Sequence, residues 1–365
     1  MNTNQPSGAQ VRWGILGAAQ IARKNWMAIS HTGNSTVTAV ASRDLERGRK
    51  FIAECQAEAP MAKTPEAFAR YEDLIASPAV DAVYIPLPTG VRKEWVVRAA
   101  AAGKHVLCEK PCALSVADLS EMIDVCARNQ VQFMDGVMFM HSGRLVRLRE
   151  VLDDGKSIGK VRRIASAFTL AAPPEFFNDN IRASSQLEPF GCLGDLGWYC
   201  IRLALWAMKW QMPRQVSGRI LSQIQSSPGQ EPVPTEFSGE LLFDDGVSSS
   251  FYCSFITEVQ EWAHISGTRG YLQFPDFVLP FNGDEVGFEV CRNTFSAKES
   301  DLGILSVTNR LTVAEHSQNH PTAQATNMFR NFSNQVLSGQ LNPTWPDIAL
   351  KTQQVMGASL DAARA

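Results

Sequence analysis

The chain has 365 residues, 45% of them hydrophobic, and a formal charge of -3 at pH 7. This length exceeds what one typical hydrophobic core organises, so we expect two folded domains. A pI of about 6.1 indicates no basic field that would attract a polyanion, which argues against nucleic acid as the main partner. Small molecules are the favoured ligands.

Three sequence features indicate where the protein is found and whether its cysteines bind metal or form disulfides. Residues 1–10 are polar and lack the basic and apolar regions of a secretory signal, so we expect a disordered lead-in and a cytoplasmic protein. Residues 201–210, the most apolar stretch, include Arg202 and Lys209, and no run reaches the roughly 20 apolar residues of a membrane span. The eight cysteines form no CxxC pair, which favours reduced, packed thiols over disulfides or a metal site.

Between residues 11 and 135, short apolar runs alternate with amphipathic segments of helical length. This alternation is typical of a parallel sheet covered by helices. The predicted strands are residues 12–16, 35–41, 82–85, 105–107 and 132–134. One helix between them should end at Gly103, and another should begin after the N-cap Ser115, with Asp118 in its first turn.

After residue 162 the pattern changes to alternating segments, namely EFSGELLF, GVSSSFYCSFI and EWAHISG, separated by turn signals. This pattern predicts a mostly antiparallel sheet. Residues 191–210 are predicted to form one helix, and residues 322–365 one or two helices with a break at Pro343 and Pro346. The fold class is therefore α/β, with a doubly wound parallel domain over residues 11–136 and an α+β domain over residues 137–365.

The segment VRWGILGAAQIARKN runs from an apolar strand directly into a helical pattern. Compared with the phosphate-binding pattern GxGxxG, Gly17 is kept, while Ala19 and Ala22 replace the second and third glycines. Backbone N–H groups and the helix dipole would still face a pyrophosphate, because alanine adds only a methyl group. The alternative interpretation is an ordinary tight turn between a strand and a helix.

The second predicted strand ends at Ser42 and Arg43, where an NAD-specific site places a carboxylate against the ribose 2′-OH. An arginine suits a 2′-phosphate, so NADP(H) is favoured and NAD(H) remains possible. In the alternative, Arg43 is solvated and Asp44 caps the next helix, which leaves the preference open.

The strand at residues 105–107 continues into Cys108-Glu109-Lys110-Pro111. Proline biases the residue before it away from helical geometry and so holds Lys110 at the carboxyl edge of the sheet, where open α/β folds bind ligands. A buried lysine beside an oxidised nicotinamide can exchange a proton near neutral pH. For a lone lysine, a solvated surface position is the alternative.

Taken together, these motifs resemble the Gfo/Idh/MocA family, named for glucose-fructose oxidoreductase and inositol dehydrogenase. The resemblance extends almost end to end and is carried by WGILGAAQIA, AVASRD, VYIPLPTGVRKEWVVRAAAAGKHVLCEKP and GCLGDLGWYCIRLALW. It implies a Rossmann domain, a C-terminal domain with an open-faced sheet, and a homodimer or higher homo-oligomer. The implied activity is hydride transfer between nicotinamide and a carbon-oxygen centre of a sugar, polyol or related diol.

The resemblance also implies catalytic residues. Lys110 would be the central proton-transfer residue, with Asp195 and Tyr199 at the D-x-x-x-H/Y positions of the family on the following helix. Residues four apart share a helix face, so both side chains could reach one substrate oxygen. Asp195 would orient the substrate or the lysine. Many relatives have histidine where this chain has Tyr199, whose usual pKa of about 10 shifts the weight of proton transfer to Lys110.

Cofactor and substrate contacts are implied at further positions. The cofactor set is Gly17, Ala18, Ala19, Gln20, Ile21, Ser42, Arg43, Pro86, Leu87, Thr89, Arg92, Glu109 and Lys110. Thr89 and Arg92 stand where the family often has Asn and His, so contacts on the nicotinamide side are expected to differ. Candidate substrate residues are Arg182, His141 and Trp198; surface or core roles are equally open for the first two, and a core role is the alternative for Trp198.

Two other functions are compatible with this resemblance. Some family members use a retained nicotinamide to hydrolyse glycosidic bonds through transient oxidation, and others are cofactor-sensing regulators without turnover. The joint presence of Lys110, Asp195 and Tyr199 favours catalysis.

Overall fold

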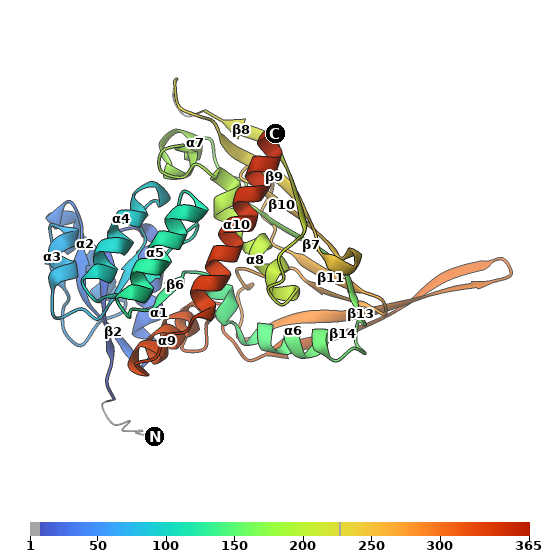
Figure 1. Ribbon diagram of the computed structural model, residues 1–365. Helices are drawn as coiled ribbons and strands as arrows, with labels where there is room; N and C mark the ends of the chain where they lie inside the picture. Colours follow the sequence, from blue (N-terminus) through green and yellow to red (C-terminus); the bar gives the residue numbers. More distant parts are fainter. Residues whose placement is uncertain (1–7, 226–227) are drawn as a thin grey trace. The chain divides into compact units, whose positions relative to one another are not determined.

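The computed structural model describes residues 8–225 and 228–365 (Figure 1). Most of the predicted lead-in, residues 1–7, lies outside the described residues. The described residues form two compact units: residues 8–141 with 318–350, and residues 142–225 and 228–317 with 351–365.

The first unit contains a six-stranded sheet in the order β3-β2-β1-β4-β5-β6, and its strands pair in parallel. The strands are β1 Val11–Leu16, β2 Ser35–Ala41, β3 Glu66–Phe68, β4 Ala82–Ile85, β5 His105–Cys108 and β6 Phe133–Asp135. The five predicted strands are confirmed to within one residue at each end. The three-residue β3 is too short to give a periodic signal.

Helices alternate with these strands. They are α1 Gln20–Ser30, α2 Leu45–Glu58, α3 Tyr71–Ala76, α4 Thr89–Ala101 and α5 Val116–Arg128, followed by the 3₁₀ turn η1 Met138–His141. Both predicted helix ends are confirmed. Ser115 Oγ accepts from the Asp118 N–H at 3.0 Å, and Gly103 follows α4 with a φ of 73°.

A C-terminal helix, α9 Gln324–Leu337, belongs to the first unit. Its Phe329 lies edge-on to Trp13 of β1 with ring centroids 5.2 Å apart, and Trp13 Nε1 donates to Ser333 Oγ at 3.3 Å. The predicted division at residue 136 therefore differs from the observed one, in which the first unit extends to residue 141 and also includes residues 318–350. A division by chain order cannot anticipate that the apolar face of α9 is buried against β1 and β4.

The second unit contains an eight-stranded sheet in the order β14-β13-β12-β11-β7-β10-β9-β8. The strands are β7 Val161–Thr169, β8 Gln215–Ile224, β9 Val233–Leu242, β10 Ser248–Ser254, β11 Ala263–Gly267, β12 Tyr271–Phe274, β13 Val286–Lys298 and β14 Asp301–Val313. All pairings are antiparallel except β7 with β10. The predicted fold class is confirmed.

The remaining helices are α6 Gly143–Asp153, α7 Phe176–Asp179, the short turns η2 Ile181–Ala183 and η4 Asp244–Gly246, the π-turn η3 Leu193–Gly197, α8 Trp198–Ala207 and α10 Thr344–Arg364. The helix predicted over residues 191–210 is thus a π-turn followed by an α-helix, and every residue of α8 is buried. The predicted break in the C-terminal helical segment is found at Pro343, which lies between α9 and α10. Pro346 instead lies in the first turn of α10, where its missing N–H has no intrahelical role, so the helix continues through it.

All eight cysteines are free thiols with buried side chains. Within the described ranges, no helix is both long and apolar enough to cross a membrane.

Candidate functional site

The loop between β1 and α1 has the geometry of an anion-binding turn. Gly17 has a φ of 110°, and a Cβ added there would lie 3.1 Å from Leu87 Cδ2. The N-cap of α1 is Ala19, which has no side-chain acceptor for the amides of the first helical turn. Gln20 and Ile21 begin that turn and are exposed. Unsatisfied amides at a helix N-terminus bind phosphate, so the loop fits the pyrophosphate of a dinucleotide despite its two alanine replacements.

The end of β2 presents a cation next to this loop. Ser42 is buried, and Arg43 is exposed. Asp44 caps α2, because its Oδ1 accepts from the N–H groups of Glu46 and Arg47 at 3.0 and 3.2 Å. The capping role weighed for Asp44 is therefore observed, while an Arg43 contact with a 2′-phosphate stays a prediction.

Sequence reasoning missed a second guanidinium at this position. Arg47 Nη2 donates to the carbonyl oxygen of Ala18 in the glycine loop at 3.2 Å. Arg43 and Arg47 both act electrostatically on Tyr71, lowering the pKa of its phenol against the larger effect of burial, which raises it. The guanidinium groups of Arg43 and Arg47 therefore both lie near Tyr71. The available signal was the spacing of four residues between them.

The backbone around Lys110 is held by a buried arginine. Lys110 follows β5 and is partly buried, and Arg92 of α4 is 3% exposed. Arg92 Nη1 donates to the carbonyl oxygens of Glu109, at 2.8 Å, and of Pro111. Its Nε donates to the carbonyl oxygen of Leu87 at 2.9 Å. The peptide carbonyls on either side of Lys110 are therefore tied to the loop that follows β4.

Thr89 belongs to the same buried cluster. Its Oγ1 donates to the Pro111 carbonyl oxygen at 3.2 Å and accepts from Arg92 Nη1 at 3.3 Å. Thr89 and Arg92 were predicted to contact the cofactor, but both side chains are turned into the protein. A contact of either residue with the cofactor stays a prediction; what the structure shows is that their side chains bind backbone carbonyl oxygens of Leu87, Glu109 and Pro111. Pro86 and Leu87 are also buried, at the carboxyl end of β4.

A second polar network holds the side chain of Glu109. The hydroxyl of Tyr84 donates to Glu109 Oε1 at 2.6 Å and accepts from Asn25 Nδ2 at 2.6 Å. Burial raises the pKa of the Tyr84 phenol, which keeps it a donor, and the Glu109 carboxylate acts in the same direction. A Cβ added at Gly136 would lie 3.1 Å from Glu109 Oε1. The sequence signal for this network is a tyrosine in the otherwise aliphatic strand AVYI.

In the second unit, the structure joins two predicted residues. Arg182 Nε donates to Asp195 Oδ2 at 2.7 Å, and the pKa of Arg182 is raised chiefly by Asp195. Asp195 lies in the π-turn, which is wider than the α-turn assumed in the spacing argument. Tyr199 is buried, with its ring centroid 5.6 Å from that of Phe168.

Trp198 and His141, both predicted to contact substrate, pack against other parts of the protein. Trp198 is fully buried and has no hydrogen-bond partner for Nε1 among the described residues, which fits the core role named as the alternative; a contact with substrate stays a prediction. His141 is in the first unit, where its Nδ1 lies 3.1 Å from Asn331 Nδ2 and its ring 6.3 Å from that of Trp345. Its role toward substrate stays a prediction. No cluster of three or more potential metal ligands occurs in residues 8–225 and 228–365.

The parallel sheet and the glycine turn after β1 define a dinucleotide-binding Rossmann domain. Residues 11–137 match the oxidoreductase family with an NAD-binding Rossmann fold, and residues 145–273 match the GFO/IDH/MocA C-terminal domain. The chain belongs to the GFO/IDH/MocA oxidoreductase family.

Two relatives show the range of named activities. The chain is 32% identical to trans-1,2-dihydrobenzene-1,2-diol dehydrogenase of Mus musculus over 276 residues, which cover 74% of this chain and 76% of the relative. It is 34% identical to dTDP-3,4-didehydro-2,6-dideoxy-alpha-D-glucose 3-reductase of Saccharopolyspora spinosa over 195 residues, 53% of this chain and 55% of that one. The second match thus spans about half the length of the relative.

Solved structures share the fold. A mutant of KijD10, a 3-ketoreductase from Actinomadura kijaniata in complex with TDP-benzene and NADP, superposes with a TM-score of 0.79 at 24% identity, covering 97% of each chain. GenD2 from gentamicin A biosynthesis, in complex with NAD, gives a TM-score of 0.78 at 18% identity, covering 100% of this chain and 97% of that one.

Proposed function

We propose that the chain is an NADP(H)-dependent dehydrogenase or reductase that acts on a carbon-oxygen centre of a sugar, polyol or related diol. Family membership supports the reaction class, and the named relatives act on a dTDP-sugar and a dihydrodiol. The observation that carries the proposal is the pair of buried networks that fix Lys110 at the carboxyl edge of the parallel sheet. Ligands bind at this edge in open α/β folds.

The cofactor would be held by backbone amides and two arginines. The first turn of α1, after Gly17, would bind the pyrophosphate, and Arg43 with Arg47 would bind the 2′-phosphate. Two guanidinium groups at this position favour NADP(H) over NAD(H). The bound nicotinamide supplies or accepts the hydride, and the protein supplies the proton and the orientation of the substrate.

We assign proton transfer to Lys110 and a positioning role to Arg92. The Arg92 guanidinium binds the carbonyl oxygens before and after Lys110, so it limits the movement of the backbone from which the ammonium extends. Asp195 and Tyr199 of the second unit are assigned to hydrogen bonding with the substrate. Arg182 binds one carboxylate oxygen of Asp195 and thereby fixes the orientation of that carboxylate. We further propose a cytoplasmic homo-oligomer.

The test begins with NADPH and NADH titrations, followed by a screen of aldoses, polyols and diols in both reaction directions. We expect tighter binding of NADPH and a stoichiometric change of nicotinamide absorbance with at least one substrate class. Turnover without net change of cofactor would instead indicate hydrolysis through transient oxidation. Cofactor binding without turnover across the screen would indicate a regulator and contradict the proposal.

A matched pair of lysine variants tests the assignment. Lys110→Met removes the proposed proton donor, whereas Lys93→Met removes a half-buried lysine of the same unit that is ion-paired with Asp118 and Glu121. We expect kcat to fall by roughly 100-fold or more in the first variant, the range of general acid-base catalysis, and to be unchanged in the second. Equal activity in both would contradict the assignment.

A further inference from the structure

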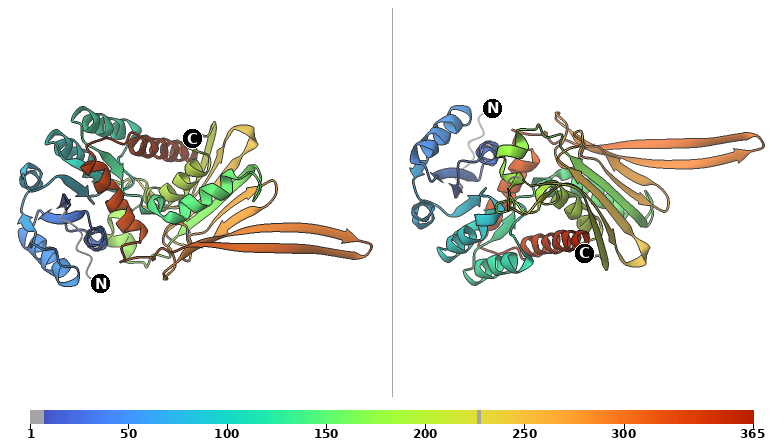
Figure 2. Two further views of the ribbon diagram at one scale, coloured as in Figure 1. Left: turned by 90° about the horizontal axis from the view of Figure 1, so that it is seen from below. Right: turned by 90° about the horizontal axis from the view of Figure 1, so that it is seen from above.

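A tyrosine begins the helix that follows β3. Tyr71 is the first residue of α3, and β3 ends shortly before it at Phe68. The Phe68 carbonyl oxygen accepts from the N–H of Ser42 at 3.0 Å, so the ends of β2 and β3 are joined where α3 begins. In both views of Figure 2, the segments coloured blue, which contain the glycine loop, the end of β2 and α3, lie side by side. Tyr71 therefore lies at the carboxyl edge of the parallel sheet, where open α/β folds bind ligands.

The hydroxyl of Tyr71 lies next to the glycine loop. Its oxygen is 3.8 Å from the position that a Cβ would take at Gly17. The Tyr71 side chain is half-buried, yet within residues 8–225 and 228–365 its hydroxyl makes no hydrogen bond. Tyrosine hydroxyls that are taken out of water usually have a hydrogen-bond partner. The donor of this hydroxyl is therefore available to a ligand bound at the loop.

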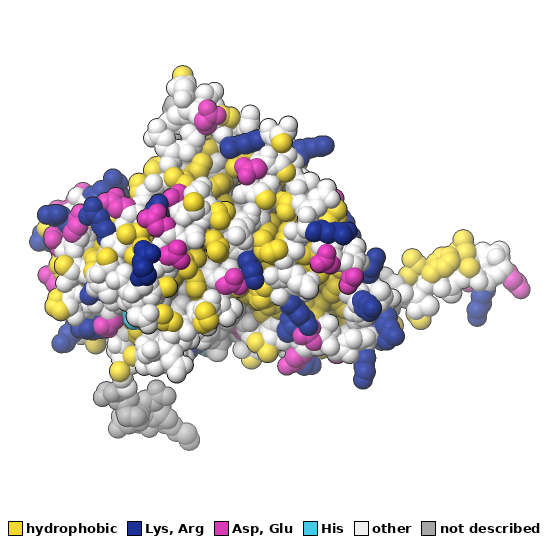
Figure 3. Space-filling model, viewed as in Figure 1, with side chains coloured by type: hydrophobic (Ala, Val, Ile, Leu, Met, Phe, Trp, Pro, Cys, Tyr) yellow, Lys and Arg dark blue, Asp and Glu magenta, His cyan; other side chains and the backbone are white. Residues whose placement is uncertain are grey.

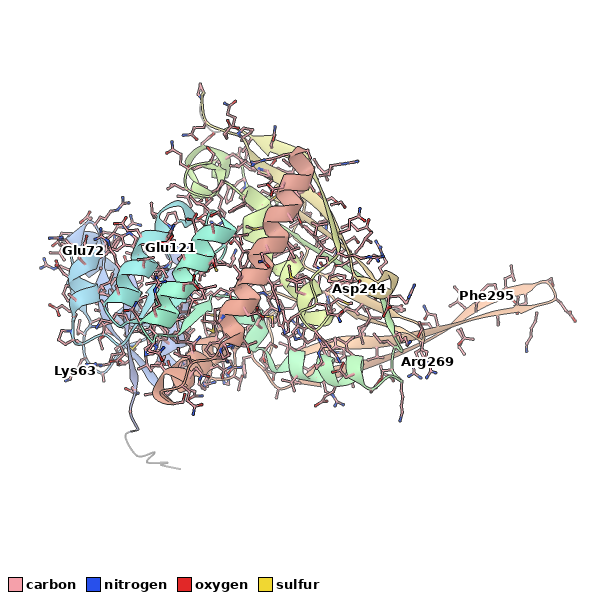
Figure 4. All side chains as sticks on the ribbon, in the orientation of Figure 1. Lys63, Glu72, Glu121, Asp244, Arg269 and Phe295 are labelled. Carbon is pink, nitrogen blue, oxygen red and sulfur yellow. The ribbon has the colours of Figure 1, made fainter. Side chains whose placement is uncertain are left out.

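Aromatic packing fixes the direction of this hydroxyl. The Tyr71 ring lies edge-on to Trp95 of α4, with ring centroids 4.8 Å apart and an interplanar angle of 83°. The Arg98 guanidinium lies over the Trp95 ring at 5.1 Å and is ion-paired with Glu72 and Glu94. Figure 4 labels Glu72, the residue after Tyr71. Because this packing involves the ring and not the hydroxyl, phenylalanine at position 71 would keep it.

The charged groups that act on the Tyr71 phenol are both cations. Burial raises the pKa of this phenol, and Arg43 and Arg47 lower it by a smaller amount, so the phenol remains a protonated donor at neutral pH. The neighbouring acid Glu72 is neutralised by its ion pair with Arg98 at 3.0 Å. Figure 3 shows basic and acidic side chains mixed over the surface of the first unit. The two guanidinium groups near Tyr71 are thus a local feature that favours an anionic acceptor.

We infer that the Tyr71 hydroxyl donates to the 2′-phosphate of NADP(H), as a third group beside Arg43 and Arg47. This inference rests on the proposed function, which supplies the cofactor. Arg47 Nη2 donates to the carbonyl oxygen of Ala18 at 3.2 Å, and the Tyr71 hydroxyl lies beside the preceding residue, Gly17. A phosphate monoester has three strong acceptor oxygens, so two guanidinium groups leave acceptor capacity for a phenol. Tyr71 is then a specificity-determining residue, because NAD(H) lacks this phosphate.

A contact with the pyrophosphate is the alternative for a hydroxyl so close to Gly17. The pyrophosphate is common to NADPH and NADH, so loss of that contact would weaken both nucleotides equally. Loss of a contact with the 2′-phosphate would weaken NADPH alone. The position of Tyr71 near Arg43 and Arg47 favours the 2′-phosphate, and the uncapped amides of the first turn of α1 are available to the pyrophosphate.

Calorimetry with Tyr71→Phe tests the inference without turnover. The titrants are NADPH, NADH and adenosine 2′,5′-bisphosphate, which carries the 2′-phosphate but no pyrophosphate or nicotinamide. We expect NADPH and the bisphosphate to bind about 10-fold to 100-fold more weakly, the effect of losing one hydrogen bond to a charged group, and NADH to bind with wild-type affinity. The matched control is Tyr252→Phe, since the Tyr252 hydroxyl contacts Thr257 and Glu236 in the second unit. This control should bind all three titrants as the wild type does.

A variant cycle tests whether the three groups meet at one phosphate. In the background of Arg43→Ala with Arg47→Ala, the further change Tyr71→Phe should weaken NADPH by less than about 3-fold, because groups that hold one ligand atom cluster are not additive. Wild-type affinity of Tyr71→Phe for NADPH, or equal losses for NADPH and NADH, would overturn the inference and leave the proposed function intact. A wild-type protein that binds neither nucleotide would contradict both.

Discussion

The arginine behind Lys110 gives the sharpest prediction. Arg92→Lys keeps the positive charge but replaces a planar group that reaches the carbonyl oxygens of Leu87, Glu109 and Pro111 with a single nitrogen. One ammonium group cannot reach all three acceptors in the same geometry. We expect one or two of these buried carbonyl groups to lose their partner.

The expected magnitude follows from those contacts. An unsatisfied buried acceptor costs about 1–3 kcal/mol, so the loss of one or two should lower the free energy of unfolding by about 1–6 kcal/mol. The backbone before and after Lys110 would also lose the hydrogen bonds that hold it in place. A misplacement of about 1 Å at a reacting group can cost on the order of 100-fold in rate, so we expect kcat to fall by about 10-fold to 100-fold. Cofactor affinity should change little, because Arg92 is buried behind the loop.

The assay compares kcat, the dissociation constant of NADPH and the urea midpoint for Arg92→Lys and a control. Arg98→Lys is the control, since Arg98 lies on the same helix but is exposed and ion-paired with Glu72 and Glu94. In a Lys110→Met background, Arg92→Lys should lower the residual rate no further, because the two residues act as one unit. A loss of stability with unchanged kcat, or additive losses in the double variant, would refute the positioning role.

Three further predictions concern the cofactor loop and a buried acid. Gly17→Ala should weaken NADPH binding at least about 10-fold in calorimetry, because alanine is strained at a φ of 110° and its Cβ would press on Leu87. The control is Gly33→Ala, at a position that also has a positive φ but open space around it, and this variant should bind NADPH with wild-type affinity. Arg43→Ala combined with Arg47→Ala should weaken NADPH far more than NADH, and equal losses would remove the 2′-phosphate role. Burial raises the pKa of Glu261 to about 7 from 4.5, so the folded state holds this proton more tightly than the unfolded state. The free energy of unfolding should therefore fall as the pH rises from about 4.5 to 7, by at most about 3 kcal/mol. Urea melts of Glu261→Gln should show a smaller fall over this pH range, and the same pH profile in wild type and variant would contradict this cause.

The strands of the first sheet and the loops at their carboxyl ends could be predicted from the sequence, because parallel buried strands are short apolar runs between turn residues. Gly17 and Lys110 were therefore predicted to follow the carboxyl ends of parallel strands, where the structure has them. The direction in which a side chain points was harder to predict. Arg92 is a charged residue beside a functional motif, and only packing shows that its guanidinium is turned inward onto backbone carbonyls.

Features that depend on distant pairing could not be predicted either. The return of α9 to the first unit requires Phe329 and Phe332 to meet Trp13, more than three hundred residues earlier. The length of the hairpin formed by β13 and β14 is set by how far the two strands remain paired, and local periodicity does not determine that length. The π-turn before α8 leaves the same apolar pattern as an ordinary helix, so Asp195 was expected in regular α-helical geometry.

The pH dependence of kcat with NADPH and a turned-over substrate, measured for wild type and Lys110→Met, tests the central claim most directly. We predict that the wild-type profile contains one ionisation that disappears in the variant, measured at NADPH concentrations that saturate both proteins. An identical ionisation in both proteins would show that another group transfers the proton, and it would contradict the assignment of Lys110.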